Sequence, residues 1–444
     1  MQDLTTGSLT GHLLKTTSFM LVSMIFQTLY ILVDLFWVGR LGTDAVAAVG
    51  LAGNLSFIVL AITQMLGVGA TTLVSHASGR KDQDQAIFLF NQSQVLSMVV
   101  AIVFLLIAML TRHQYAASQA ASEGMRIATE DYLLWFIPAM ALQFAMVAMG
   151  AALRGTGNFR PGMIVQTATV VINMVLAPFL IFGWGPFPVW GVTGAAVSTL
   201  VAIVIGVVWL AFYFIDAKAY LRFHVGHWSP QLKVWWEMLK IGLPAGMEFA
   251  LMGVYLAVVY AITKPFGAAA QGGFTIGLRV VQSAFLPVVA LGFAVAPVAG
   301  QNFAARKTGR VRAAFKAAAS MAAGAMVLSG IVLYVWARPI MGIFTTDAEV
   351  IRVGVEYLRI VVLTFVASGV TFVVSSMFQA LGNTLPSLLT SGLRLVLSVT
   401  PAVVLSRSAG FHLTWIWYIG VIAVFTQMTA GLLMLQREFR LKLA

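Results

Sequence analysis

The strongest constraint on the fold is an internal repeat in which matching residues lie 225 positions apart. Lys15 matches Lys240 and Gly42 matches Gly267, with no gap in the register between them. Longer matches join 66–67 with 291–292, 131–133 with 356–358, and 157–161 with 382–386. Agreement at one constant offset over so much of the chain is improbable by chance. We therefore interpret the chain as two copies of one structural unit.

The composition predicts a protein embedded in a membrane. The chain is 60% hydrophobic and 9% charged, with a mean hydropathy of +0.92, whereas about 25% of residues in soluble domains are charged. A helix that crosses a bilayer needs roughly 20 mostly apolar residues. Twelve such stretches are present, at 12–38, 46–76, 88–111, 125–152, 161–184, 191–215, 236–263, 271–302, 313–337, 348–380, 385–406 and 413–436. The chain has no cysteine, so neither a disulfide framework nor a thiolate metal site is expected.

An even number of spans in each copy fixes the expected architecture. Six crossings return the chain to its starting side, so both copies insert in the same orientation. We expect an all-α membrane protein with two six-helix lobes related by a pseudo-twofold axis along the membrane normal. The lobes are assigned to residues 1–215 and 241–444, joined by a cytoplasmic linker at 216–240. Duplicated hydrophobic halves are typical of secondary transporters, which bind substrate in a cleft between the repeats.

The linker contains Trp235 and Trp236 beside lysine residues. Such a composition favours a helix lying in the membrane interface. We expect this segment to act mainly as a tether between the lobes.

The basic residues indicate the orientation. The side that holds both termini carries seventeen, namely Lys15, Arg80, Lys81, Arg154, Arg160, Lys218, Arg222, Lys233, Lys240, Arg306, Lys307, Arg310, Arg312, Lys316, Arg437, Arg440 and Lys442. The other side carries eight, namely Arg40, Arg112, Arg126, Lys264, Arg338, Arg352, Arg359 and Arg407. The positive-inside rule therefore places both termini in the cytoplasm. Topology and anionic lipid account for much of the net charge of +12, and a nucleic-acid partner is not expected.

Two carboxylates, Asp34 and Glu248, fall inside predicted spans. A carboxylate in hydrocarbon is costly and normally serves ions, protons or substrate. Asp34 could instead pair with Arg40, but six residues is a poor helical spacing for a direct pair. Glu248 follows Pro244 closely, so it could be a first-turn residue that interacts with the helix dipole. The matching positions, Val259 and Ser23, carry no acid, and the coupling chemistry is therefore expected mainly in the first lobe.

Other polar side chains inside the spans are less specific. Arg279 and Arg394 need partners, for which we expect backbone carbonyls or Glu248. The polar residues of the first lobe could line a substrate path or simply join helices; they are Gln27, Tyr30, Asn54, Gln64, Asn91, Gln92, Gln143, Asn173 and Thr199. The 21 methionines and 30 phenylalanines would give an adaptable wall, although most must face lipid or fill the core.

Several short segments resemble one transporter family over essentially the whole chain. They are LVDLFWVGRLG at 32–42, ALRGTGN at 152–158, VINMVL at 171–176, GVTGAAVST at 191–199 and FQALGN at 378–383. Together with the two six-span copies, they resemble the multidrug and toxic compound extrusion (MATE) transporters, and most closely the DinF-like branch. That resemblance implies that Asp34 binds the coupling cation, and that Tyr132, Asn173 and Thr199 form the polar cluster around it.

Two departures from the family pattern refine this expectation. The branch often has a second aspartate four residues after the asparagine, where this chain has Ala177 before Pro178. Sodium prefers several hard oxygen ligands, whereas a proton needs one carboxylate, so the loss favours proton coupling. The other bacterial branch has a glutamate and an aspartate in spans seven and ten, where this chain has Met252 and Val370. Glu248 is therefore expected to be at most a secondary or substrate site, together with Gln27, Tyr30, Gln64 and Asn54.

The resulting expectation is multidrug efflux by cation-coupled antiport in a bacterial-type inner membrane. The coupling ion is expected to be H⁺ rather than Na⁺, with no cofactor and no resident metal. The expected partners are small organic, often cationic, substrates and membrane lipid, and the carrier is expected to act as a monomer. Sodium-coupled antiport and a lipid-linked precursor flippase are the alternatives. An enzyme is not expected, because no nucleophile–base pair, metal-ligand spacing or phosphate loop is present.

Overall fold

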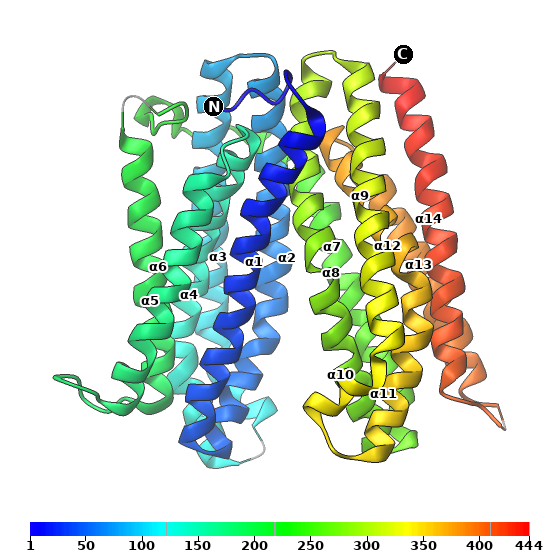
Figure 1. Ribbon diagram of the computed structural model, residues 1–444. Helices are drawn as coiled ribbons and strands as arrows, with labels where there is room; N and C mark the ends of the chain where they lie inside the picture. The colour runs from blue at the N-terminus through cyan, green and yellow to red at the C-terminus, as the bar shows by residue number, and fades with distance from the viewer. Residues whose placement is uncertain (121, 217–218, 409, 444) are drawn as a thin grey trace. The chain divides into compact units, whose positions relative to one another are not determined.

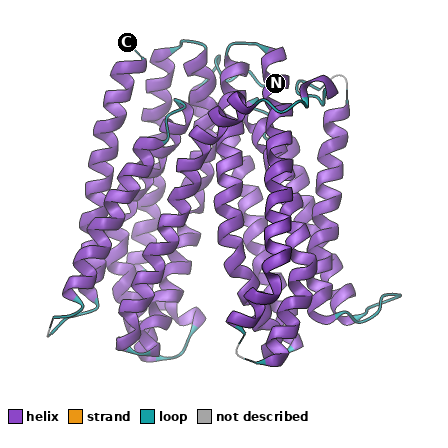
Figure 2. Cartoon of the chain, turned by 180° about the vertical axis from the view of Figure 1, so that it is seen from behind, coloured by secondary structure: helices purple, strands orange, loops and turns teal. Residues whose placement is uncertain are grey.

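The computed structural model describes residues 1–120, 122–216, 219–408 and 410–443. Within these residues all regular elements are helical (Figure 2), which confirms the expected all-α class. The chain packs as two compact units, Met1–Asp3 with Ser18–Gly246, and Leu4–Thr17 with Met247–Ala444. Lys218, which was counted among the basic residues of the linker, lies outside the described residues.

The described part of the first repeat contains six long helices, which can be followed in Figure 1. They are α1 (Leu9–Val38), α2 (Thr43–Gly79), α3 (Gln83–Gln119), α4 (Glu123–Gly155), α5 (Arg160–Phe182) and α6 (Gly191–Ile215), with the 3₁₀ turn η1 (Gly39–Leu41) after α1. In this unit α4 packs against α2, α3 and α6, and most of its apolar residues are buried.

The second repeat follows the same order with two additional breaks. Its elements are α7 (Leu232–Thr263), η3 (Lys264–Phe266), α8 (Ala268–Ala304), α9 (Thr308–Val335), α10 (Ala337–Phe344), α11 (Ala348–Val361), η4 (Val362–Thr364), α12 (Phe365–Ala380), α13 (Leu385–Leu405) and α14 (Thr414–Lys442). The short helix α10 was not predicted from the sequence. At the 225-residue offset α10 matches the last residues of α3, which runs on without a break in the first repeat. Pro339 follows the break in the second repeat, and a proline inside a helix removes a backbone hydrogen bond.

The offset of 225 residues is reproduced in the backbone. The bounds of α2 and α8 differ by 225 at both ends, as do those of η1 and η3. Two non-glycine residues have positive φ, Lys81 at 58° and Arg306 at 56°, and they too are repeat partners. The side chain of Asn158 donates to Tyr213, and the side chain of Asn383 donates to Glu438, again at matching positions. The duplication seen in the sequence is therefore a duplication of structure.

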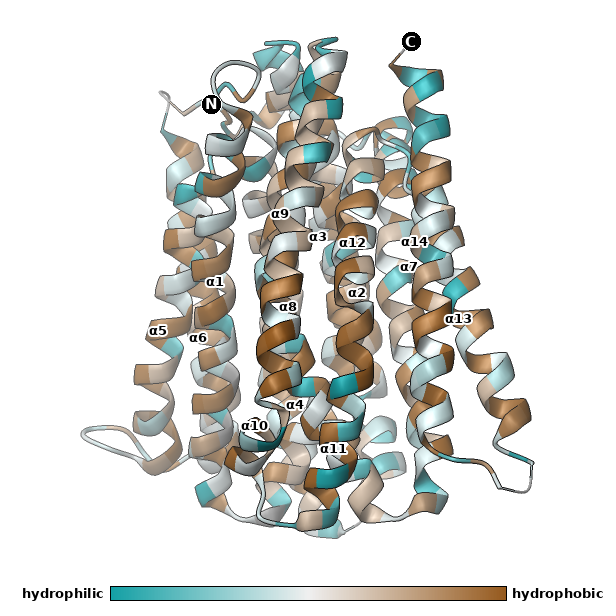
Figure 3. Cartoon of the chain, turned by 45° about the vertical axis from the view of Figure 1, so that its right-hand side comes forward, coloured by the Kyte–Doolittle hydropathy of each residue, from teal (hydrophilic) through white to brown (hydrophobic). Residues whose placement is uncertain are grey.

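Twelve helical segments in the described part of the chain are long and apolar enough to cross a membrane, which is the number expected. In Figure 3 hydrophobic colouring dominates the middle of the helices and hydrophilic colouring gathers toward their ends. Several helices begin earlier than predicted, because polar residues cap them ahead of the apolar stretch. Asp82, for example, accepts a hydrogen bond from the backbone of Gln85 at the start of α3.

The expected interfacial helix in the linker is wrong. Trp235 and Trp236 lie in the first turns of α7 itself, which runs without a break from Leu232. Before α7 the linker has only the 3₁₀ turn η2 (Val225–His227). The amphipathic composition that suggested a surface helix belongs instead to the polar start of a membrane span.

Two buried amides of α3 hold this linker in place. Asn91 donates to the carbonyl of Arg222 at 3.0 Å and accepts from the indole N–H of Trp228 at 2.9 Å. Gln92 donates to the carbonyls of His227 and Ser229 and accepts from Trp235. Because a buried amide that loses its partners is costly, Asn91 and Gln92 are explained by this structural role rather than by a substrate path.

The N-terminal segment is held in a similar way by the second unit. Asn302 donates to the carbonyl of Leu4 at 3.0 Å, and Gln301 accepts from the Leu4 backbone N–H at 3.1 Å. Lys307 donates to the Thr5 carbonyl at 2.8 Å, and Arg310 donates to the Gly7 carbonyl at 3.0 Å. Leu4 is fully buried. The segment that leads into α1 is therefore packed as part of the fold.

Glycine allows α2 and the first part of α7 to approach closely. A Cβ atom added to Gly242 would lie 1.9 Å from the carbonyl oxygen of Met65. One helical turn later, a Cβ on Gly246 would lie 2.6 Å from the carbonyl oxygen of Ala61. The backbones therefore meet directly at this pair of small residues, as in other small-xxx-small helix contacts in membranes.

We predict that Gly242→Ala destabilises the carrier by about 1–3 kcal/mol or more, because a helical carbonyl cannot move aside and α7 must shift. The control is Gly253→Ala in the same helix, where an added Cβ meets nothing within 4 Å. That change should be neutral or stabilising by up to ~1 kcal/mol. Melting temperatures of the purified carrier in detergent measure both effects. Equal melting temperatures for the two variants would show that the close contact is unimportant.

Candidate functional site

Asp34 lies one turn before the end of α1 and is 9% exposed. Its Oδ1 atom is buried and has no hydrogen-bond partner. The alternative pairing with Arg40 is not formed. Instead the guanidinium of Arg40 lies over the ring of Phe36, 4.5 Å from its centroid. Asp34 thus makes no ion pair within the described residues.

Three of the other predicted residues form a hydrogen-bonded chain beside it. Asn173 of α5 donates to the hydroxyl of Thr199 of α6 at 3.0 Å. Thr199 donates its one hydroxyl proton to the carbonyl of Ala195 at 3.1 Å. Tyr30 of α1 therefore acts as donor in its 3.3 Å contact with Thr199. Because this proton is committed to Thr199, it is not available to Asp34.

Tyr132 of α4 completes the group. Its side chain is 2% exposed, and its ring packs against Phe136 with the centroids 5.0 Å apart. The charge of Asp34 acts on the phenol groups of both Tyr30 and Tyr132. These residues come from four helices, α1, α4, α5 and α6, of which α4 and α5 each pack against α6. We call Asp34, Tyr30, Tyr132, Asn173 and Thr199 the acidic cluster.

The remaining first-lobe candidates do not join the acidic cluster by hydrogen bonds among the described residues. Gln27 lies on the same helix seven residues before Asp34, and its side chain is exposed. Asn54 of α2 is also exposed, and Gln64 of α2 is half-buried. In a span, exposed polar side chains of this kind face water or lipid headgroups rather than hydrocarbon.

Glu248 belongs to the second unit, in α7. Its Oε2 atom accepts a hydrogen bond from Ser375 of α12 at 3.4 Å, and Ser387 of α13 donates to Ser375 at 2.7 Å. Its Oε1 atom is buried without a partner. Glu248 therefore lies well inside α7, and the interpretation as a residue of the first helical turn is wrong because α7 begins at Leu232.

The expected pairing of the span arginines with Glu248 is also wrong. Arg394 of α13 makes no ion pair within the described residues, and its guanidinium lies 5.8 Å from the ring centroid of Tyr255. Arg279 of α8 is exposed. Neither arginine contributes a side-chain hydrogen bond to Glu248, whose described partner is Ser375.

The serines near Asp34 and Glu248 were not identified from the sequence. Ser198 accepts from Asn173 at 3.4 Å, and Ser375 and Ser387 contact Glu248 or each other. A signal for the last two was present in the repeat. Their partners at the 225-residue offset are Gly150 and Gly162, so a hydroxyl appears only in the copy that carries Glu248.

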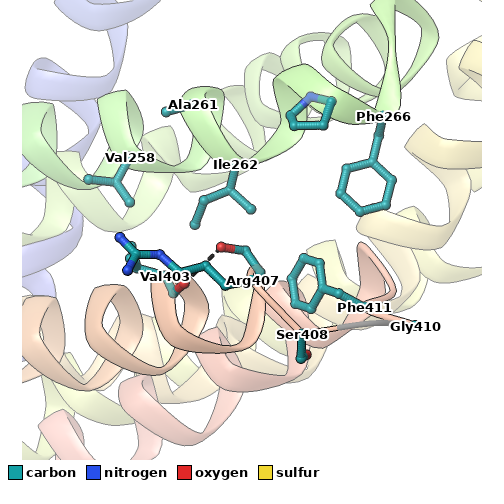
Figure 4. Close-up of a pocket in the computed structure, with 11 residues that line it drawn as sticks. Val258, Ala261, Ile262, Phe266, Val403, Arg407, Ser408, Gly410 and Phe411 are labelled. Atoms are coloured by element: carbon teal, nitrogen blue, oxygen red, sulfur yellow. Dashed lines mark hydrogen bonds between the residues drawn. The ribbon is translucent and has the colours of Figure 1, made fainter.

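A surface depression of the second unit does not contain these residues. It has a volume of about 620 Å³ and is lined by the ends of α7 and α13 and by the segment after α13, including Ile262, Arg407 and Phe411. Figure 4 shows Arg407 beside the apolar side chains of the lining. It is open and holds no second titratable group, so it offers no coupling chemistry.

Comparisons with known proteins agree with the fold and the duplication. The MatE family model matches residues 20–179 and 244–404. The multidrug export protein MepA of Staphylococcus haemolyticus is 27% identical over 368 residues, which cover 82% of this chain and 80% of that protein. The probable multidrug resistance protein YoeA of Bacillus subtilis is 24% identical over 90% of this chain and 87% of its own length.

Solved structures show the same fold. A MATE crystal structure in complex with MaL6 superimposes with a TM-score of 0.92 at 22% identity, covering 99% of this chain and 98% of that one. The outward-facing conformation of a multidrug resistance MATE family transporter gives a TM-score of 0.91 at 22% identity, covering 99% of this chain and 97% of that one.

The twelve candidate spans in the described part of the chain and the MatE model that matches both repeats define an integral membrane transport protein. Because the family model matches most of both repeats, the chain belongs to the MatE (MATE) family of transporters.

We predict that Thr199→Val destabilises the carrier by about 1–3 kcal/mol, because the N–H of Asn173 and the hydroxyl of Tyr30 lose their shared partner while the volume is kept. Thr199→Ser restores the hydroxyl and serves as the control. Melting temperatures in detergent compare the two. A valine variant as stable as the serine variant would contradict the hydrogen-bonded chain.

Proposed function

We propose that this carrier exports cationic or amphipathic organic compounds by proton-driven antiport. The observation that carries the proposal is the buried, unpaired carboxylate of Asp34 at the centre of the acidic cluster. Such a group can take up either a proton or the positive charge of a substrate, but not both. The names of MepA and YoeA, a multidrug export and a probable multidrug resistance protein, support the substrate class.

The transport cycle follows from exclusive binding at one group. A proton that arrives from outside neutralises Asp34 and releases the cationic substrate. The protonated carrier turns inward, loses its proton to the more alkaline cytoplasm and binds new substrate. Each ligand lowers the affinity for the other by the same factor. The membrane potential supplies about 2.3 kcal/mol per charge for each 100 mV.

Two features favour a proton over sodium as the coupling ion. Ala177 stands where a second acid is common in the DinF-like branch, and Asn173 turns its amide N–H groups toward Ser198 and Thr199. A sodium ion prefers several hard oxygen ligands, of which charged ones bind most strongly. Glu248 would serve as a secondary or substrate site in the second unit.

The proposal includes the setting of the carrier in the cell. Seventeen basic residues on the side of the termini against eight on the other support a cytoplasmic location of both termini, in what we propose is a bacterial-type inner membrane. The carrier would act as a monomer with small organic substrates and surrounding lipid, and with no cofactor.

We predict that Asp34→Asn lowers substrate efflux from energised proteoliposomes by at least about tenfold. The reason is that an amide cannot bind a proton and a cationic substrate in turn. The parent should respond to a pH gradient alone and not to a sodium gradient alone.

The control is Asp44→Asn, which removes an exposed acid at the start of α2 and should keep the parent rate within about twofold. Efflux driven by sodium would support the sodium-coupled alternative. Full efflux by Asp34→Asn would move the coupling site to Glu248.

A further inference from the structure

The second unit keeps the two tyrosines of the acidic cluster. Tyr30 and Tyr132 have Tyr255 and Tyr357 as their partners at the 225-residue offset. In each unit the two phenol groups lie close enough for each to influence the ionisation of the other. Tyr357 is 6% exposed and is fixed by Phe274 and Trp417. The repeat has therefore preserved a tyrosine pair in each unit.

The charge beside this pair is opposite in the two units. Asp34 is replaced by Val259, and the acidic partner is lost. Instead the guanidinium of Arg394 lies 5.8 Å from the ring centroid of Tyr255, and it is near enough to Tyr357 to influence the ionisation of that phenol. Arg394 matches Thr169 of the first repeat. The charged residue therefore belongs to α13 in the second unit, whereas Asp34 belongs to the first helix of its unit.

Arg394 lies in the middle of α13, nine residues after Leu385 and eleven before Leu405. Its side chain makes no ion pair or hydrogen bond within the part of the chain that the structure describes, and its one described contact is the face of Tyr255. A cation at this depth is costly and normally faces a water-filled cavity or a ligand. Five N–H donors in a planar fork remain available to such a ligand.

We propose that Arg394, with the hydroxyls of Tyr255 and Tyr357, binds the carboxylate of amphipathic substrates in the second unit. A guanidinium binds a carboxylate through two parallel charge-assisted hydrogen bonds, and phenol hydroxyls add further donors. The proposal rests on the proposed efflux function and extends its substrates from cations to zwitterions that carry both charges.

A matched pair of dyes tests this inference. A rhodamine with a free benzoate is a zwitterion, and its methyl ester is a cation of nearly the same shape. Binding of each dye to the purified full-length carrier is measured by fluorescence anisotropy. The variants are Arg394→Gln, which removes the charge, and Arg394→Lys, which keeps it. Arg407→Gln is the control, because it removes an exposed charge at the end of the same helix.

We expect Arg394→Gln to weaken binding of the free-acid dye by about tenfold, equivalent to ~1.4 kcal/mol, and to leave the ester within about twofold. Arg394→Lys should retain part of the affinity for the acid, and Arg407→Gln should change neither dye.

Equal weakening of both dyes by Arg394→Gln would overturn the inference and assign Arg394 a structural role. Unchanged binding of the acid dye would overturn it as well. Displacement of the acid dye by glycerol phosphate, but not by benzoate, would overturn it in favour of a lipid headgroup site. Export of the ester dye by the parent and its loss in Asp34→Asn test the proposed function separately, because the ester carries no carboxylate.

Discussion

Burial of the Asp34 carboxylate is the constraint around which the first unit is organised. A buried acid inside a span is costly, and it normally serves ions, protons or substrate. Three of the polar side chains grouped with Asp34 are joined by hydrogen bonds. Asn173 donates to Thr199, Thr199 donates to a backbone carbonyl, and Tyr30 donates to Thr199. Asp34 is left as the group of the cluster whose charge can change without breaking a hydrogen bond.

The two repeats share most of their backbone structure but differ in the charged side chains beside their tyrosine pairs. Matching helix bounds and matching positive φ angles at Lys81 and Arg306 show how closely the scaffold is retained. The tyrosine pairs are retained too, but they frame a carboxylate in one unit and the guanidinium of Arg394 in the other. The two repeats therefore share a tyrosine pair but carry opposite charge beside it.

The sequence predicted the twelve spans, because hydropathy and the repeat depend on residue type at fixed spacing. The family resemblance named Asp34, Tyr132, Asn173 and Thr199, of which the structure joins Asn173 and Thr199 by a hydrogen bond. Prediction from the sequence failed where contacts join residues far apart in the chain. The role of Asn91 and Gln92 in holding the linker depends on backbone groups more than 130 residues away, which no local pattern records. The polar start of α7 was mistaken for a surface helix, because composition does not distinguish the two. The predicted pairing of Arg394 with Glu248 is wrong because the contacts of both side chains join residues far apart in the chain.

The most direct test of the account is the number of protons released when a cationic substrate binds to the purified carrier in weakly buffered detergent solution. The account predicts release of about one proton for each bound cation near the midpoint of the titration, and no release from Asp34→Asn, because one group exchanges the two ligands. Tight binding by the parent without proton release, or equal release by Asp34→Asn, would contradict it.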